Sequence, residues 1–326
     1  MDVVGGADTS GAYRSFALEQ AHDGSATYEH LATSIATDSD LLDVIDQLPP
    51  IKRQPNLLFG AVRFLDGPIG DFGLFKSWTL NNWEKVSAVM RVRLTQTNEV
   101  ARCASLLPLL AQLPGRLALL EVGASAGLCL YPDRYQYQYG NKWVGDANSL
   151  VLLTCETTGP VPIPAAVPNV VWRGGIDLNP LDLTNASDLR WLESLIWPEQ
   201  TDRLTRLRVA ARIVQSDPPN IVQGDLNDDL LALVDTVPLD ATLVIYHSAV
   251  LAYLSESKRQ SFVETVCQLR GHWISNEGPR VLPDIAQGLP ERPAGAPARF
   301  LMALDGHPVA WTAPHGQSIE WLTDAQ

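Results

Sequence analysis

The chain has 326 residues, 46% hydrophobic and 19% charged, which is the composition of an ordinary globular protein with one large or two modest cores. Its net charge of -13 argues against nucleic acid or an anionic membrane surface as the main partner. No apolar run is long enough to span a membrane, and the first residues lack the pattern of a signal peptide. The four cysteines are scattered without zinc spacing, so we expect no metal site and a reduced, cytoplasmic setting.

The first third of the chain is predicted to be helical. Residues 1–14 are small and polar and are expected to form a disordered tail, after which apolar residues recur at intervals of three and four. Residues 1–115 are therefore interpreted as an all-helical N-terminal cap. Near its end, Gln96, Glu99 and Arg102 share one helical stripe. They form either an exposed ion pair or part of the lining of a cofactor pocket.

The stretch LALLEVGASAGLCL, residues 117–130, is the centre of the remaining sequence. It begins as an apolar run, reaches an acid at Glu121 and continues into a loop of small residues. Such a run, bounded by glycine, is typical of a strand buried on both faces of a parallel sheet. Gly123 and Gly127 allow a tight turn and a close approach of the backbone to a ligand.

Strands and helices then alternate as in a mostly parallel, doubly wound α/β sheet. Residues 135–139 alternate with period two and residues 149–154 are apolar, which predicts a hairpin inside an insertion at about 131–169. Residues 278–299 hold five prolines and are expected to form an irregular loop or a lid. The further strands are predicted at 170–177, 221–225, 241–246 and 272–275, and an antiparallel C-terminal hairpin at 300–304 and 309–312.

Polar residues follow several of these strands, where ligands of parallel sheets bind. The pattern Glu121-x-Gly123-x-x-x-Gly127 resembles the first motif of class I S-adenosylmethionine (SAM) dependent methyltransferases. GIDLNP at 175–180 resembles their second motif, IVQGDLND at 221–228 the third, and DATLVIYHSAVLAYLS at 240–255 the fourth. The resemblance implies a Rossmann-like methyltransferase fold over residues 116–326.

The same resemblance implies SAM as cofactor and a small-molecule methyl acceptor, such as a specialised metabolite. His247 and Tyr246 would border the reacting methyl group, with His247 as the candidate base, although either side chain could instead be structural. The oligomeric state is left open. The residues that the resemblance assigns to cofactor binding are Glu121, Gly123, Ser125, Gly127, Asp177, Asp225 and Leu226.

A narrower resemblance covers nearly the whole chain. The sequence is similar to an uncharacterised bacterial family, domain-of-unknown-function family 2332, which implies a fold but no reaction. The stretches that carry the similarity are NLLFGAVRFL, QTNEVARCA, LLEVGASAGL, DRYQYQYG, RGGIDLNPLDLT and WTAPHG.

The sequence departs from the methyltransferase pattern, and two alternatives remain. Ser125 stands where the middle glycine is common, and Asp177 lies 56 positions after Glu121, where about 20 is usual. Pro132 shortens the helix that should follow the loop. One alternative is a SAM-fold protein that binds a ligand or acts without methyl transfer. The other is a serine hydrolase, because Gly123-x-Ser125-x-Gly127 resembles a nucleophile elbow, with Asp225 or Asp240 and then His247, His307 or His315 downstream.

Overall fold

The computed structural model describes residues 8–22, 24–290 and 297–323, and its contacts divide the chain into two compact units. Unit 1 comprises Met1–Thr97 and Thr184–Thr205, and unit 2 comprises Asn98–Leu183 and Arg206–Gln326. Relative to the predicted division at residue 115, residues 98–115 fall in unit 2 and residues 184–205 fall in unit 1. That the helical part caps the sheet stays a prediction.

Unit 1 is helical throughout its described elements. Residues 9–14, predicted to belong to a disordered tail, instead open the first helix, where Asp8 accepts a hydrogen bond from the Ser10 N–H as an N-cap; the rest of that tail, 1–7, lies outside the described residues. The helices are α1 (Thr9–Phe16), η1 (Ala17–Ala21), α2 (Ala26–Ile35), α3 (Ser39–Ile45), η2 (Pro50–Lys52), α4 (Pro55–Phe64), α5 (Phe72–Asn81), α6 (Trp83–Val92) and α8 (Ala186–Leu195), and α9 (Thr201–Ser216) begins here.

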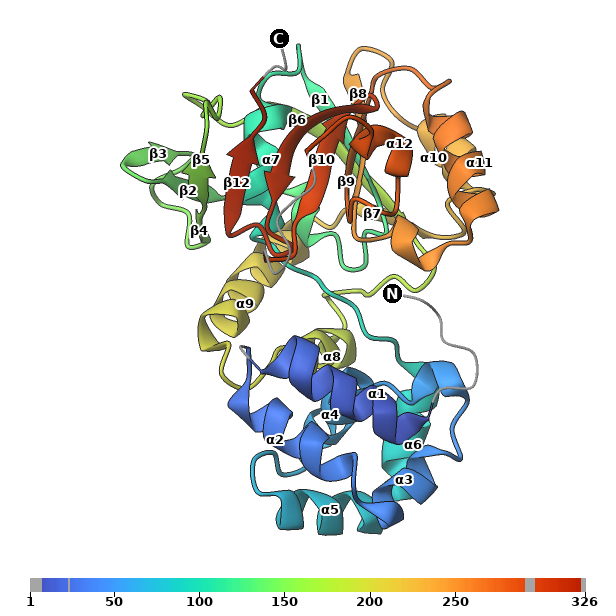
Figure 1. The fold of residues 1–326 in the computed structure, drawn as a ribbon. Helices are drawn as coiled ribbons and strands as arrows, with labels where there is room; N and C mark the ends of the chain where they lie inside the picture. The colour runs from blue at the N-terminus through green and yellow to red at the C-terminus, as the bar shows by residue number, and fades with distance from the viewer. Residues whose placement is uncertain (1–7, 23, 291–296, 324–326) are drawn as a thin grey trace. The chain divides into compact units, whose positions relative to one another are not determined.

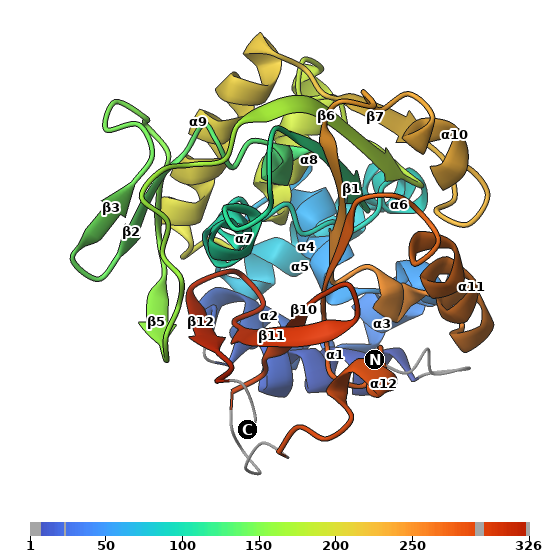
Figure 2. The same ribbon diagram turned by 90° about the horizontal axis from the view of Figure 1, so that it is seen from above.

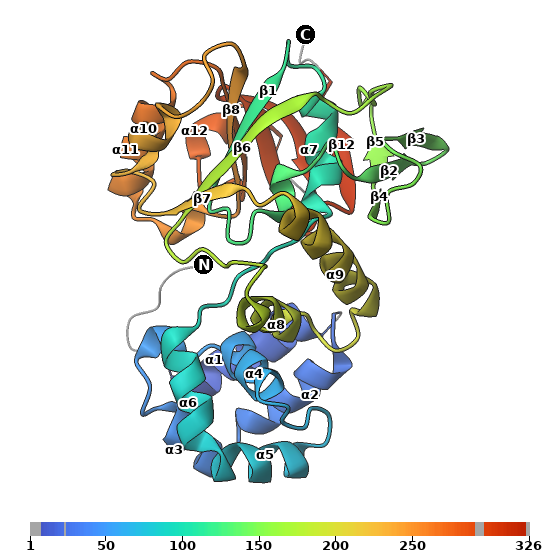
Figure 3. The same ribbon diagram turned by 180° about the vertical axis from the view of Figure 1, so that it is seen from behind.

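The core of unit 1 is aromatic and is centred on Phe59 of α4. Its ring lies 4.4 Å from the ring of Tyr28 and 5.9 Å from that of Phe75, measured between centroids. Helix α8 joins this core from far along the sequence and packs on α4, as Figure 3 shows. The contact is close because Gly60 has no side chain: a Cβ there would lie 2.9 Å from Leu195.

Unit 2 is built on a nine-stranded sheet among its described residues (Figure 1). The spatial order is β5-β12-β11-β10-β9-β8-β1-β6-β7. The strands are β1 (Leu117–Val122), β5 (Glu156–Thr158), β6 (Val170–Asp177), β7 (Asn220–Gln223), β8 (Thr242–Ser248), β9 (His272–Glu277), β10 (Phe300–Leu304), β11 (His307–Thr312) and β12 (Ser318–Trp321). The helices are α7 (Arg102–Leu110), η3 (Leu128–Leu130), α10 (Leu230–Val234), η4 (Leu251–Tyr253), α11 (Glu256–Val266) and α12 (Pro283–Ala286), together with the rest of α9.

Five neighbouring strands, β7-β6-β1-β8-β9, are parallel to one another. Numbered along the chain, their order is 3-2-1-4-5, which is compatible with a Rossmann-like fold. The order reverses between β1 and β8, and ligands of such sheets bind at that point, beyond the carboxyl ends of the strands. Strands β9 to β12 continue the sheet as an antiparallel meander, which confirms the predicted closing hairpin in β10 and β11.

The two faces of the parallel strands are covered by different helices. Ala118, Leu120 and Val122 of β1 belong to a core cluster with residues of α10 and α11. Because side chains alternate along a strand, Leu117, Leu119 and Glu121 point to the other face, which α7 covers. Figure 2 shows α7 on one side of the sheet and α10 and α11 on the other.

The predicted insertion between β1 and β6 is present, but the hairpin predicted within it is wrong. Strand β2 (Gln136–Tyr139) pairs antiparallel with β3 (Lys142–Val144), and β4 (Leu152–Thr154) lies parallel to β2 on its other side. Residues 149–154 therefore do not turn back on β2. The tight turn at Gly140, with a φ of 58°, closes the hairpin earlier than predicted. Beyond β4, β5 leaves this small sheet and pairs with β12 at the edge of the main one.

Within the described residues, no helix combines the length and the apolar character needed to cross a membrane.

The face that α11 covers depends on Phe262, which is fully buried and meets the rings of His247 and Trp273 edge-on. We expect Phe262→Ala to lower the free energy of unfolding by about 3–5 kcal/mol, because it leaves a cavity in a packed core. Tyr253→Ala is the matched control, since Tyr253 is 87% exposed and should change stability by under about 0.5 kcal/mol. Denaturant unfolding of both variants tests this, and equal losses would contradict the packing described.

Candidate site at the carboxyl edge of the parallel strands

The loop after β1 has a backbone that depends on small residues. Gly123 and Gly127 both have a φ of 71°, and Ser125 has a φ of 51°, so three positions are in the left-handed region. A Cβ on Gly123 would lie 2.4 Å from Cγ2 of Val250, in the segment after β8. Gly123 therefore allows the two strand-end segments on either side of the order reversal to touch.

Asp177, at the end of β6, holds this loop in place. One of its carboxylate oxygens accepts a hydrogen bond from the Ser125 N–H at 2.8 Å, and the other accepts one from the Asn179 N–H at 2.7 Å. The backbone of β6 contributes as well, because the Ile176 carbonyl accepts from the N–H groups of Gly123 and Ala124. The structure thus brings Asp177 to the loop despite the long insertion between them.

Glu121 is the polar residue of β1 that lacks a partner. Its Oε2 atom is enclosed by the protein, and neither carboxylate oxygen accepts a hydrogen bond from the described residues. Burial raises the pKa of this carboxyl well above its ordinary value of 4.5, the nearby Cys129 and Asp177 raise it further, and the Arg102 guanidinium lowers it. Glu121 as a whole is half-buried, and a carboxyl with one enclosed, unpartnered oxygen favours a cation or a hydrogen-bond donor supplied by a ligand.

Ser125 has a second enclosed and unpartnered polar atom. The residue is 7% exposed, and its Oγ has no hydrogen-bond partner among the described residues. A serine nucleophile needs a base within hydrogen-bond reach of its hydroxyl. The arrangement in the described residues therefore favours a ligand-facing hydroxyl over a hydrolase triad, although its left-handed backbone is also what a nucleophile elbow has.

His247, the predicted base, is held on both ring nitrogens. Its Nδ1 lies 2.7 Å from Oε1 of Glu277, and its Nε2 accepts a hydrogen bond from the Trp273 indole at 3.1 Å. Because an indole N–H only donates, the proton of a neutral His247 is on Nδ1. The ring is 1% exposed. This geometry favours the structural alternative for His247.

Glu277 also fixes the segment that follows β8. Besides its contact with the His247 ring, its Oε1 accepts hydrogen bonds from the N–H groups of Val250 and Leu251. Its Oε2 is enclosed and has no partner in the described part of the chain. Val250 is the residue that contacts Gly123. Glu277 and His247 therefore hold in place the segment after β8, which contacts the loop. Their own side chains do not face the loop.

The remaining predicted residues lie at two places. Tyr246 is 3% exposed and its hydroxyl donates to the Cys129 carbonyl at 3.0 Å, so its ring is part of the core beside Glu121, its partner in the register of β1 and β8. Asp225 follows β7 and accepts from the Asn227 N–H and from Lys258. The Asn227 N–H is the first cause of its lowered pKa, and Lys258 adds to it. Leu226, next to Asp225, packs against the core cluster of the α11 face.

A polar chain at the same edge was not predicted from the sequence. The Thr312 hydroxyl donates to Oδ1 of Asn276 at 2.7 Å, and Nδ2 of Asn276 donates to the Ser248 hydroxyl at 3.1 Å. Arg102, left open between surface and pocket, donates to the Ser248 carbonyl. Polar residues at the ends of β8 and β9 were the available signal, but only the sheet order makes those ends neighbours.

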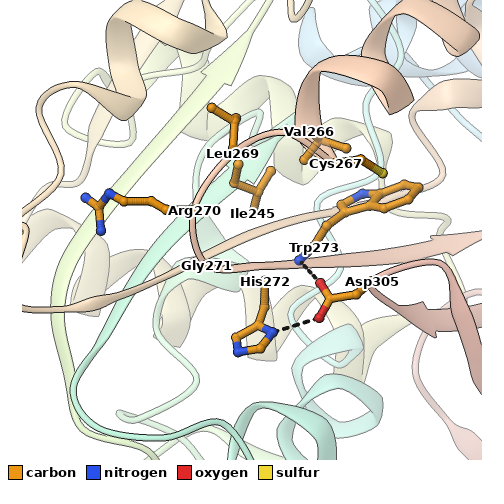
Figure 4. Close-up of a pocket in the computed structure, with 9 residues that line it drawn as sticks. All are labelled: Ile245, Val266, Cys267, Leu269, Arg270, Gly271, His272, Trp273 and Asp305. Carbon is orange, nitrogen blue, oxygen red and sulfur yellow. Dashed lines mark hydrogen bonds and ion pairs between the residues drawn. The ribbon is translucent and has the colours of Figure 1, made fainter.

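Two hollows lie away from this loop. One, of about 240 Å³, is formed at the amino end of β9, where Asp305 accepts from the Trp273 N–H and pairs with His272 (Figure 4). It is at the edge of the sheet opposite to the one where ligands bind in sheets of this kind. The other, of about 630 Å³, is bordered by Ala101 and by residues of β4 and β5. Its volume is within the range of small-molecule pockets.

The carboxyl of Glu121 makes the free energy of unfolding depend on pH, and this dependence can be measured without a ligand. Since its folded pKa is raised, the folded state binds more protons than the unfolded state. Its contribution to stability is fully present below pH 4.5 and is lost as pH rises through the folded pKa. Glu121→Gln should therefore become more stable relative to the parent as pH rises above 4.5, by up to about 1.4 kcal/mol per pH unit.

Asp225→Asn is the control of opposite sign. The pKa of Asp225 is lowered, so its contribution is present at neutral pH and is lost as pH falls through the folded pKa. This variant should be less stable than the parent at pH 7 and equal to it in acid. Urea unfolding from about pH 2 to 8 measures both differences, because the lowered pKa of Asp225 lies below the acid end of a narrower range. A Glu121→Gln difference that stays constant over that range would refute the enclosed carboxyl.

Comparison with known proteins and families shows to which family the chain belongs. No curated protein matches the sequence. The model of a family described as "Uncharacterized protein conserved in bacteria (DUF2332)" matches residues 10–67 and 68–321, which is nearly the full length. Because this match covers nearly the whole chain, the protein belongs to this bacterial family, DUF2332.

Proposed function

We propose that this protein binds SAM at the loop after β1 and transfers its methyl group to a small molecule. The observation that carries the proposal is a pair of enclosed polar atoms that have no partner among the described residues, Oε2 of Glu121 in β1 and Oγ of Ser125 in the loop. They lie where the strand order reverses, at the edge that binds ligands in such sheets. A polar ligand that carries positive charge together with hydroxyl groups fits these atoms, and SAM, with its sulfonium, its ammonium group and its ribose hydroxyls, is of that kind.

Each strand-end acid has a defined part in this proposal. Glu121 would bind positive charge, and a cation there would lower its raised pKa. Asp177 already accepts two backbone hydrogen bonds, and because each carboxylate oxygen can accept more than one, it keeps capacity for ribose hydroxyls. Asp225, one strand further along, would lie near the adenine, with Leu226 as an apolar neighbour.

Bound SAM supplies an activated methyl group on a sulfonium. The protein then acts mainly by positioning, which can provide about 7–11 kcal/mol, whereas a general base adds a factor of roughly 10² to 10⁴. The proposal is thus compatible with a His247 whose two ring nitrogens are both held by other side chains. Tyr246 and His247 would shape the site from within the sheet, and no base is assigned.

A small molecule is the proposed acceptor because of charge. The net charge of -13 disfavours nucleic acid, since phosphate-backbone binding depends on clustered Lys and Arg side chains.

Calorimetry with SAM and S-adenosylhomocysteine tests the proposal. Both should bind the parent protein, and Asp225→Ala should weaken binding by about 10- to 100-fold, since it removes a charged hydrogen-bond acceptor. Asp228→Ala is the matched control, because Asp228 is exposed three residues away and should bind as the parent does. No binding by the parent would end the proposal. Binding without S-adenosylhomocysteine release across a broad acceptor panel would favour a ligand-binding protein of this fold.

A further inference from the structure

Arg102 is a half-buried arginine fixed by backbone atoms rather than by an acid. It is the first residue of α7, and its Nε donates to the Pro314 carbonyl at 2.9 Å. Its Nη1 donates to the carbonyl of Ser248, the last residue of β8, at 3.1 Å. The guanidinium is therefore clamped at the carboxyl edge of the sheet, on the face that Glu121 also points to.

The clamp is tight because the segment before β12 approaches α7 without side chains in the way. Gly316 has a φ of 77°, and a Cβ there would lie 2.1 Å from the Ala101 carbonyl oxygen. The carbonyl of Pro314 is thereby brought to Arg102. Two stretches that the family resemblance singled out, QTNEVARCA and WTAPHG, thus meet at this arginine.

The charge of Arg102 is left without an ion pair. No acidic side chain lies within salt-bridge distance of it in the described part of the chain, whereas Arg206 nearby is paired with Glu99. A guanidinium has five N–H donors, and the described residues use two of those of Arg102. One on Nη1 and both on Nη2 remain, which is the edge that binds a carboxylate with two parallel hydrogen bonds.

The loop after β1 lacks the positive end of a helix that would otherwise attract an anion. Only η3, a single turn of three residues, follows Gly127. The N–H groups of Gly123, Ala124 and Ser125 already donate to the end of β6. A ligand carboxylate at this loop must therefore find its positive charge elsewhere, and Arg102 is close enough for its charge to lower the pKa of Glu121.

We propose that Arg102 binds the carboxylate of the methionyl part of the cofactor, while Glu121 faces its positive charge. This inference rests on the proposed function. Opposite charges that do not pair with each other within 4 Å suit a ligand that carries both signs, as the zwitterionic end of SAM and S-adenosylhomocysteine does. The other source of a carboxylate would be the methyl acceptor, and the experiment separates the two.

Two ligands that differ in the amino-acid part test the proposal by calorimetry. S-adenosylhomocysteine carries the methionyl-type carboxylate, and 5′-methylthioadenosine has the same nucleoside without it. We expect Arg102→Gln to weaken S-adenosylhomocysteine about 10- to 100-fold, the effect of losing a charge-assisted hydrogen bond, and to leave methylthioadenosine within twofold of the parent. The unchanged nucleoside affinity shows that the variant is folded.

Arg270→Gln is the matched control. Arg270 also donates to backbone carbonyls of unit 2, those of Ala241 and Val237, but it lies before β9 at the opposite edge of the sheet. It should leave both affinities unchanged. Arg102→Lys keeps the positive charge but cannot form the two parallel hydrogen bonds of a guanidinium. Its affinity for S-adenosylhomocysteine should therefore lie between those of the parent and Arg102→Gln, while its affinity for methylthioadenosine stays unchanged.

The possible failures are distinguishable. If the parent binds neither ligand, the proposed function and this inference both fail. If the parent binds both but Arg102→Gln keeps full affinity for S-adenosylhomocysteine, or loses both ligands equally, only the role of Arg102 fails. If Arg102→Gln does not fold, Arg102→Lys is measured instead. A ratio of S-adenosylhomocysteine affinity to methylthioadenosine affinity equal to that of the parent then overturns the inference.

Discussion

The pairing of Asp177 with the loop after β1 is the contact on which the candidate site depends. Its carboxylate holds the Ser125 N–H, and this bond keeps a non-glycine residue in a left-handed conformation. The end of β6 accommodates the loop because Gly175 has no Cβ, where one would lie 2.5 Å from Ala124. Ser125 can therefore replace the usual glycine: an acid on the neighbouring strand fixes the turn that glycine would otherwise only permit.

The two faces of the sheet differ in how their polar groups are paired at this edge. On the α11 face, Glu277 accepts three hydrogen bonds on one oxygen and ties His247 to the segment after β8. On the α7 face, Glu121 accepts none from the described residues and Arg102 keeps an unpaired charge. Burying charge without a partner is costly, so the second arrangement is the one that gains most from a ligand.

The sequence predicted the elements of this site better than their contacts. Strand ends at Glu121, Asp177 and Asp225 could be located because apolar runs with terminal acids are local patterns. The sequence could not show whether His247 is a base or a structural residue. That depends on its partners Trp273 and Glu277 in β9, which are 26 and 30 residues away along the chain. The pairing of β4 parallel to β2 was missed for the same reason: strand order is a tertiary property, and two strand patterns separated only by residues 140–148 favour a hairpin prediction.

Arg102 shows how the structure resolves what a helical stripe leaves open. Spacing placed Glu99 and Arg102 on one stripe, which suits an ion pair as well as a pocket lining. In the structure Glu99 is buried and pairs with Arg206, so Arg102 is released from the pair that its spacing allows. The carbonyls that hold Arg102 lie at the end of β8 and before β12, more than 140 residues away along the chain. An arginine oriented by carbonyls retains its full charge for a ligand, because its anchoring groups are neutral.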